Sequence, residues 1–183
     1  MKNIILVANE DEANQLSVDN LNCDVIITGE GRTNVIQTLT ECLKEGIITD
    51  EKTIINVGYV GGKGFNKGDV VAIDEVGLVK PSLTIKEPNI FLDKSNQTIR
   101  KTMFDWCKSY TTCFTSENFV NSDDIPYLPE QCVCDMELYW IALMFPKVIS
   151  IKIVSDTLNY NEYKEAKLHE SWNKVYQAVK EIL

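Results

Sequence analysis

Acidic side chains follow most of the apolar, strand-like runs of this sequence, at the point where each run ends. Six such ends read Asn9-Glu10-Asp11-Glu12, Gly29-Glu30-Gly31-Arg32, Gly58-Tyr59-Val60-Gly61-Gly62, Ser116-Glu117-Asn118-Phe119, Asp135-Met136-Glu137 and Ser155-Asp156. In α/β sheets, ligands bind just beyond the carboxyl ends of the strands. Five of the six ends can therefore deliver carboxylates to one rim, where such groups can donate protons, orient water or accept hydroxyl groups.

Each of these acids also has a purely structural interpretation. Asp156 could cap a turn, Glu137 could be an acid in the first turn of a helix, and Glu12 could simply be solvated. For any one residue alone the structural role is the commoner one. The whole set of ends, taken together with two glycine turns, favours a ligand site.

The two glycine turns exclude some ligands and leave others open. Gly29-Glu30-Gly31 lacks the third glycine of a dinucleotide-binding turn, and the chain has no GKS or GKT sequence, so neither a dinucleotide nor a triphosphate is favoured. The stretch 58–62 would let the backbone approach a ligand closely, but a tight corner after a strand would need the same residues.

The elements that must position these residues alternate between strands and helices. Continuous apolar runs interleaved with amphipathic segments predict a largely parallel or mixed sheet that is covered on both faces. We therefore expect an α/β fold with three layers, α/β/α, around one central mixed sheet, in a single domain over residues 1–183. The predicted strands span 3–8, 24–28, 53–58, 69–73, 110–116 and 148–154, and the predicted helices span 33–46, 96–109, 135–145 and 161–183, with 78–91 an irregular connection or an edge strand.

Composition excludes several function classes. The chain is 44% hydrophobic and 25% charged, as expected for a globular domain, and its net charge of −9 without a basic stripe argues against nucleic-acid binding. No apolar run approaches the roughly 20 residues that a membrane span needs. The N-terminal MKNIILVANEDE is typical of a buried strand rather than of a signal peptide, so we expect a cytoplasmic protein. Six scattered cysteines and a single histidine indicate reduced thiols, no metal and no cofactor.

Four blocks of the sequence, in order, resemble the nucleoside phosphorylase/nucleosidase family. The first is TGEGRTNV at 28–35, and the second is INVGYVGG followed by KGDVV within 55–71. The third and fourth are CDMELYWIA at 134–142 and VSDTLN at 154–159. The subgroup that the chain resembles most is the 5′-methylthioadenosine/S-adenosylhomocysteine nucleosidases, whose first strand is followed by a segment similar to ANEDE at 8–12. The resemblance implies a nucleoside phosphorylase-like fold and hydrolysis of the N-glycosidic bond of a purine nucleoside.

The resemblance also implies a role for three carboxylates. Asp156 matches the general acid that protonates the leaving base near N7. Glu137 matches the carboxylate that accepts the ribose hydroxyl groups, and Glu12 matches the residue that orients the attacking water. The remaining residues of the implied site would contact the substrate: they are Met136, Phe119, Val120, Tyr59, Gly61 and Ser155. Of these, Met136 would pack on the sugar, and Phe119 and Val120 would pack on the base.

Two alternatives to hydrolysis remain open at this level. Phosphorolysis needs cationic groups for phosphate, but the chain contains only Arg32 and Arg100, so water is favoured as the nucleophile. A non-catalytic protein that binds purines or a partner on the same fold is the second alternative. It is suggested by the bulky Tyr59 and by Leu138-Tyr139-Trp140, where the family has small residues.

Relatives in this family form dimers around the pocket, and the aromatic residues of the predicted helix at 135–145 look exposed. We therefore expect a homodimer that binds a small-molecule nucleoside.

Overall fold

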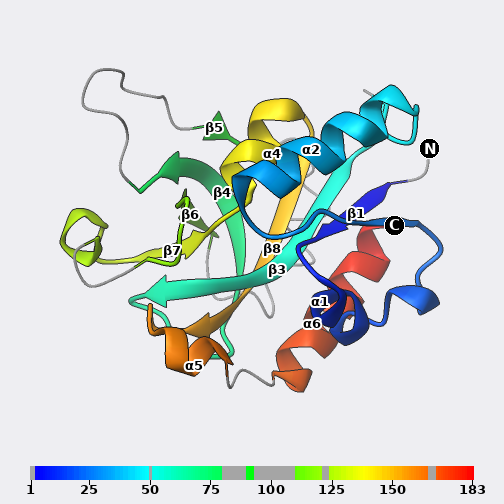
Figure 1. Ribbon diagram of the computed structural model, residues 1–183. Coiled ribbons are helices and arrows are strands. Elements are labelled where there is room, and N and C mark those ends of the chain that lie inside the picture. Colours follow the sequence, from blue (N-terminus) through cyan, green and yellow to red (C-terminus); the bar gives the residue numbers. More distant parts are fainter. Residues whose placement is uncertain (1–2, 50, 80–89, 93–109, 121–123, 165–167) are drawn as a thin grey trace, which may run out of the picture.

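Eight strands in the described part of the chain form one mixed sheet, and helices cover both of its faces (Figure 1). The computed structural model describes residues 3–49, 51–79, 90–92, 110–120, 124–164 and 168–183. The strands are β1 (Ile4–Val7), β2 (Asp24–Ile27), β3 (Ile54–Lys63), β4 (Val70–Leu78), β5 (Ile90–Phe91), β6 (Tyr110–Thr115), β7 (Cys132–Asp135) and β8 (Val148–Asp156). The helices are α1 (Glu10–Gln15), α2 (Gly31–Lys44), α4 (Leu138–Met144), α5 (Tyr160–Lys164) and α6 (His169–Ile182), with short 3-10 turns at Val18–Asn20 and Ile125–Tyr127.

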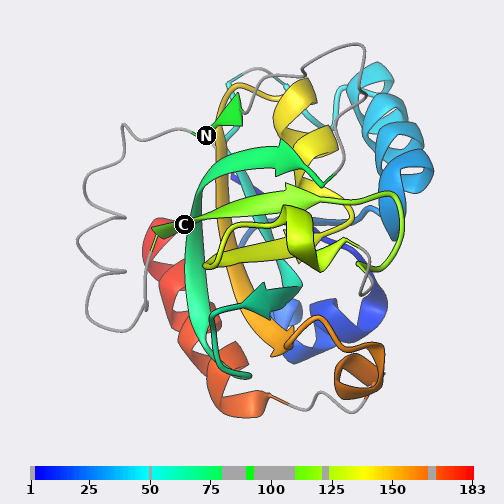
Figure 2. The ribbon, with the colours of Figure 1, turned by 90° about the vertical axis from the view of Figure 1, so that its left-hand side faces the viewer.

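The strand order confirms the predicted mixed sheet and adds a closed circuit to it. The order is β2-β1-β3-β7-β6-β4-β5, and β8 pairs with both β3 and β4. Consequently β3, β7, β6, β4 and β8 surround a common interior. β1 runs parallel to β2 and β3, and β8 runs parallel to β3 but antiparallel to β4. Figure 2 shows this bent sheet from the side on which β4, β6 and β7 lie.

All six predicted strands are present in this one sheet, but β3 continues well past the predicted end at residue 58. The glycines that we assigned to a turn are strand residues, because Gly61 pairs with Cys134 of β7 and Gly62 pairs with Val133. A register shift after Val60 also brings Gly61 opposite Asp156 of β8. The long β3 therefore delivers its glycines to the carboxyl end of β8.

Residues 132–135 correct the predicted start of the third helix. We placed 135–145 in a helix, whereas Cys132–Asp135 form β7 and α4 begins only at Leu138. The strand arises from pairing on both sides, with β3 and with β6. Met136 and Glu137 form the short link between the strand and the helix.

The predicted helix at 161–183 is two helices. Leu168, which precedes α6, has a non-helical backbone with φ −113° and ψ 55°. The amphipathic pattern was correct for α6, whose Trp172, Val175 and Val179 are buried. The predicted helix at 96–109 lies outside the described residues. Of the proline-containing stretch 78–91, the described part ends in the edge strand β5, which pairs with β4.

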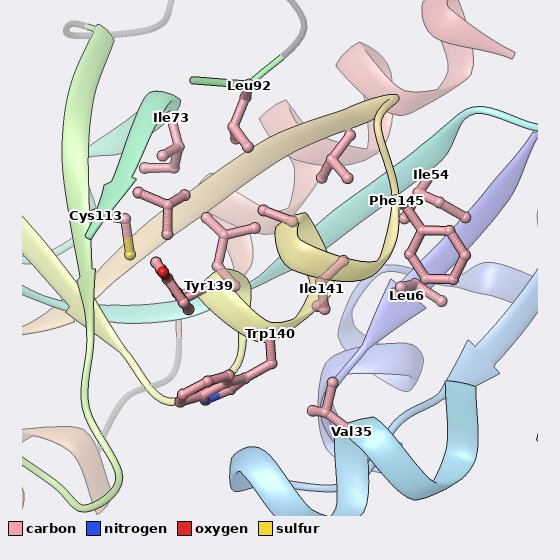
Figure 3. Packing of buried hydrophobic residues seen from close by; sticks show 14 of the residues in the cluster. Leu6, Val35, Ile54, Ile73, Leu92, Cys113, Tyr139, Trp140, Ile141 and Phe145 are labelled. Atoms are coloured by element: carbon pink, nitrogen blue, oxygen red, sulfur yellow. The ribbon is translucent and has the colours of Figure 1, made fainter. Parts of the chain in front are cut away.

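Two apolar clusters occupy the two faces of the sheet and confirm the three-layer arrangement. One cluster packs the sheet against α2 and α4, and the other packs it against α1 and α6. Figure 3 shows Tyr139, Trp140 and Phe145 of the first cluster, and all three are at least nine-tenths buried. Our expectation of exposed aromatic residues on this helix was therefore wrong, and the homodimer that we inferred from it stays a prediction.

The predicted burial of the cysteines is confirmed for all of the described ones except Cys23. Cys42, Cys113, Cys132 and Cys134 are buried free thiols and Cys23 is half-buried, while Cys107 lies outside the described residues. None of the helices in the described ranges is long and apolar enough to cross a membrane.

Candidate active site

A cavity of about 500 Å³ lies at the carboxyl ends of β1, β3, β7 and β8. The structure brings all nine sequence-predicted site residues to its wall: Glu12, Tyr59, Gly61, Phe119, Val120, Met136, Glu137, Ser155 and Asp156. These residues come from segments that are far apart in the sequence, and the closed circuit of strands gathers them. Their roles stay predictions.

Glu12 projects from α1 into the interior and is only 4% exposed. Asn9 caps α1 by accepting a hydrogen bond from the Glu12 backbone N–H at 3.0 Å. The Glu12 carboxylate accepts the backbone N–H groups of Ala8 and Tyr59, each at 2.8 Å. Burial raises the pKa of Glu12, and these two donors oppose that shift. The solvated alternative for Glu12 is therefore wrong.

A glycine makes this placement of Glu12 possible. A Cβ atom on Gly58 would lie 2.8 Å from Glu12 Oε1 and 3.0 Å from its Oε2, closer than real contacts allow. Any larger residue would push the carboxylate away from the Tyr59 N–H.

Glu137 lies between β7 and α4 and binds the first residue of α2. Its Oε1 accepts the backbone N–H of Gly31 at 2.8 Å, and its Oε2 accepts the N–H of Met136 at 3.3 Å. The side chain caps no N–H of α4, although Glu137 is the residue that precedes this helix. Burial, followed by the negative charge of Asp135, raises the pKa of Glu137 to about 7.

Asp156 ends β8 and is 1% exposed. The Ser155 hydroxyl lies 2.7 Å from Asp156 Oδ2, and the Asn159 N–H donates to Asp156 Oδ1 at 3.1 Å. The second bond is the turn cap of the structural interpretation, so Asp156 both caps a turn and lines the cavity. Burial raises the pKa of this carboxyl group, which favours its protonated form. Gly61 of β3 leaves room for this carboxyl group, because a Cβ atom on residue 61 would lie only 3.0 Å from Asp156 Oδ1.

Aromatic rings form another part of the cavity wall. Phe119 lies 5.2 Å from Tyr160 and 6.0 Å from Tyr163, measured between ring centroids. Tyr59 does not fill the cavity, because its hydroxyl accepts the indole N–H of Trp172 at 2.7 Å and holds the ring toward α6. Sequence reasoning missed Tyr160 and Tyr163 as residues of the site. Tyr163 lies near the start of the segment that we predicted as one long helix, and Tyr160 lies just before it.

Sequence reasoning also missed a buried ion pair beside the cavity. Lys152 of β8 is 2% exposed, and its Nζ lies 3.1 Å from Oδ2 of Asp135, a cavity residue. The signal that could have revealed it is a lysine in the middle of the apolar run VISIKIV. An isolated charge in such a strand needs a buried partner.

Cationic side chains are absent from the described wall of the cavity. Arg32, the arginine that we placed on the rim, instead forms an ion pair with Glu117 at 2.9 Å and lies 4.6 Å from the centroid of the Trp140 ring. Within the ranges that the structure describes, no cluster of histidine, cysteine or acidic residues has the arrangement of a metal site.

Comparisons with known proteins support the fold. No family model matches the chain, and no curated protein matches it. Among solved structures, the 5′-methylthioadenosine/S-adenosylhomocysteine nucleosidase of Neisseria meningitidis, in complex with methylthio-immucillin-A, is 20% identical with a TM-score of 0.78 over 99% of this chain and 100% of that one. The Streptococcus pneumoniae enzyme, with a transition-state inhibitor, is 20% identical with a TM-score of 0.81 over 100% of both chains. A futalosine hydrolase mutant of Helicobacter pylori is 14% identical, with a TM-score of 0.79 over 98% and 97%.

At these identities the likeness establishes the fold. The nucleoside phosphorylase-like fold, which four short sequence blocks predicted, is thereby confirmed.

Proposed function

We propose that this chain hydrolyses the N-glycosidic bond of a purine nucleoside. The observation that carries the proposal is the meeting of Glu12, Glu137 and Asp156, from three distant segments, at one cavity that also contains Phe119. Three buried carboxyl groups around one space are costly unless a ligand or a reaction uses them. The shared fold with nucleosidases supports the same conclusion.

Asp156 supplies the proton for the leaving base. When the bond between C1′ and N9 breaks, its electron pair goes to the purine, which leaves as a neutral molecule only if another nitrogen such as N7 takes up a proton. Burial raises the pKa of Asp156, which favours the protonated carboxyl group that this role requires. The turn bond from Asn159 holds Oδ1, and Ser155 lies beside Oδ2.

Glu137 holds the ribose. In its ionised form it accepts hydrogen bonds from the sugar hydroxyl groups, and its negative charge stabilises the positive charge that develops on the sugar as the bond breaks. The N–H of Gly31 fixes one carboxylate oxygen from the start of α2. A free lone pair remains on each oxygen for the sugar.

Glu12 orients the attacking water. Each of its oxygens accepts one backbone N–H, which fixes the plane of the carboxylate and leaves a lone pair on each for water. The water oxygen bonds to C1′, one water proton passes to Glu12, and the products are the free base and the free sugar. Met136 packs on the sugar, while Phe119 and Val120 pack on the base.

The lining residues support water rather than phosphate as the nucleophile. Phosphate needs cations, but the described cavity wall has none and Arg32 is occupied by Glu117 and Trp140. Arg100 lies outside the described residues. The bulky residues that suggested a non-catalytic protein leave the cavity open. Tyr59 lines the wall with its hydroxyl held by Trp172, and Tyr139 is buried in the core.

We propose that the substrate belongs to the class of 5′-methylthioadenosine and S-adenosylhomocysteine, because the structural neighbours are nucleosidases with these names. The cavity volume of about 500 Å³ is within the range for small-molecule sites.

The test is incubation of the purified protein with adenosine, inosine, uridine and 5′-methylthioadenosine, with and without phosphate. We expect free purine and free sugar from a purine nucleoside, at rates that phosphate does not change. A sugar phosphate that forms only with added phosphate would establish phosphorolysis instead. Tight binding without release of base would establish the non-catalytic alternative.

A further inference from the structure

Lys152 occupies an unusual position at the centre of the molecule. Its neighbours in β8, Ile151 and Ile153, pack toward α6, so Lys152 projects from the opposite face of the strand toward the start of α4. Among the residues that the structure describes, it is the one lysine or arginine that is buried. Burying an ammonium group is costly, and a nearby carboxylate must compensate that cost.

The compensating carboxylate belongs to a network that caps α4. Asp135 Oδ2 accepts the N–H of Leu138 at 3.0 Å as well as the ion pair with Lys152, and Asp135 Oδ1 accepts the hydroxyl of Thr115 at 2.6 Å. The Thr115 hydroxyl oxygen in turn accepts the N–H of Tyr139 at 2.9 Å. The first two N–H groups of α4 are therefore satisfied by side chains from β7 and β6, which fixes the start of the helix.

Glu137 lies inside this network along the chain, between the capping residue Asp135 and the capped residue Leu138. The residue that follows it, Leu138, is fixed by its bond to Asp135, and its own carboxylate accepts the N–H of Gly31 of α2. We propose that Lys152, acting through Asp135, is a positioning residue that sets both the place and the charge of Glu137. The proposal rests on the proposed function, because that function gives Glu137 its role toward the ribose.

The charges around Glu137 indicate how Lys152 acts. Burial and the charge of Asp135 raise the pKa of Glu137, the charge of Lys152 lowers it, and Glu12 of α1 raises it again. The thiol of Cys113 on β6 also faces this group, and burial raises its pKa so that it stays neutral.

The hydroxyl of Tyr163 on α5 faces the same group, and burial likewise raises its pKa. Among the described groups, Lys152 therefore carries the one positive charge that stabilises the ionised form of Glu137.

Two substitutions with opposite charge changes separate this role from a merely structural one. Lys152→Met removes the positive charge, so the acid limb of the pH profile of kcat/KM should move to higher pH. A shift of about one unit lowers the ionised fraction of Glu137 at pH 7 about fivefold. Asp135→Asn removes a negative charge and keeps an acceptor for Leu138, so its limb should move to lower pH.

Two further variants serve as controls. Lys152→Arg keeps the charge and should keep the wild-type midpoint. Lys52→Met makes the same charge change at a surface ion pair with Asp24, and its midpoint should also stay at the wild-type value. Circular dichroism verifies the fold of each variant.

A second readout does not require turnover. With ¹³C-labelled glutamate, the Glu137 carboxyl signal can be assigned from its absence in Glu137→Gln and titrated directly by NMR. The expected order of midpoints is Asp135→Asn below wild type and Lys152→Met above it. If nucleosides are not hydrolysed but this order holds, the proposed function fails and the positioning role stands. Equal midpoints, or shifts in the same direction, overturn the positioning role. If Lys152→Met does not fold, Asp135→Asn decides: a midpoint below wild type supports the role, and an unchanged or higher midpoint overturns it.

Discussion

The two faces of β8 differ in chemical character, although their residues alternate along one strand. The face toward α6 presents Ile151 and Ile153 to a cluster that contains Trp172 and Val175. The opposite face carries buried polar groups between the apolar Val148 and Val154: Ser150 binds Asn56 at 3.1 Å, and Lys152 pairs with Asp135.

This difference separates stability from chemistry. The α6 face is stabilised by removing apolar surface from water, which depends on volume and shape. The opposite face buries charges that oppose folding unless each is paired, and it leads directly to Ser155 and Asp156 at the cavity. Substitutions on the α6 face should therefore change stability, and those on the cavity side should change activity and its pH dependence.

The largest expected effect is on the cavity side. Asp156→Asn removes the proton for the leaving base while the amide still binds the purine, so base release should fall by about 10²–10⁴-fold and purine binding should persist. Release is measured by chromatography and binding by calorimetry. The matched control is Asp19→Asn on the exposed 3-10 turn, which should be as active as wild type. Base release by Asp156→Asn at the wild-type rate would remove Asp156 from the mechanism.

On the α6 face, Trp172→Ala should lower the free energy of unfolding by about 3–5 kcal/mol, because a large buried ring is lost. Trp172 is 1% exposed and donates to the hydroxyl of Tyr59. Urea unfolding measures the change. The pH midpoints of any remaining activity should be unchanged; if they moved as in Lys152→Met, the two faces would not be separable in this way.

The raised pKa of Glu137 has a consequence for stability. Its pKa is about 7 in the folded chain against an ordinary value of 4.5, so between these values the folded state binds the proton more tightly than the unfolded state. Stability should therefore fall as the pH rises from 4.5 to 7, on the order of 3 kcal/mol from this group at most. Urea unfolding of wild type and Glu137→Gln at pH 5 and pH 8 isolates it. Relative to Glu137→Gln, wild type should be less stable at pH 8 than at pH 5. A difference in the free energy of unfolding that is equal at both pH values would contradict the account.

The smallest effect is expected for Tyr59→Phe. This change removes the acceptor for the Trp172 indole N–H but keeps the ring in the cavity wall, so unfolding should become easier by about 1–3 kcal/mol. Because the backbone N–H of Tyr59, not its hydroxyl, binds Glu12, kcat/KM should stay near the wild-type value. A large fall in kcat/KM would instead place the hydroxyl in the reaction.

The sequence predicted the strands and the wall of the cavity because both follow local patterns. Apolar runs predict buried strands, and polar residues at their ends predict a rim, which is how Glu12, Glu137 and Asp156 were found. β7 was missed as a strand because four residues carry little periodicity and its pairing with β3 and β6 is non-local.

The sequence between α5 and α6 contains no glycine or proline that would indicate two helices rather than one. We missed the ion pair of Lys152 because this lysine lies within an apolar run and its partner Asp135 is distant in the sequence. These misses share one cause, namely contacts between segments that no local pattern encodes.

The central claim is that Glu12, Glu137 and Asp156 act on one nucleoside in one cavity. The most direct test is a crystal structure of this chain with methylthio-immucillin-A, the compound bound by the Neisseria meningitidis nucleosidase. We predict the base of this compound between Phe119 and Asp156 and its sugar-like ring on Glu137. Binding anywhere else, or an empty cavity at saturating concentration, would contradict the account.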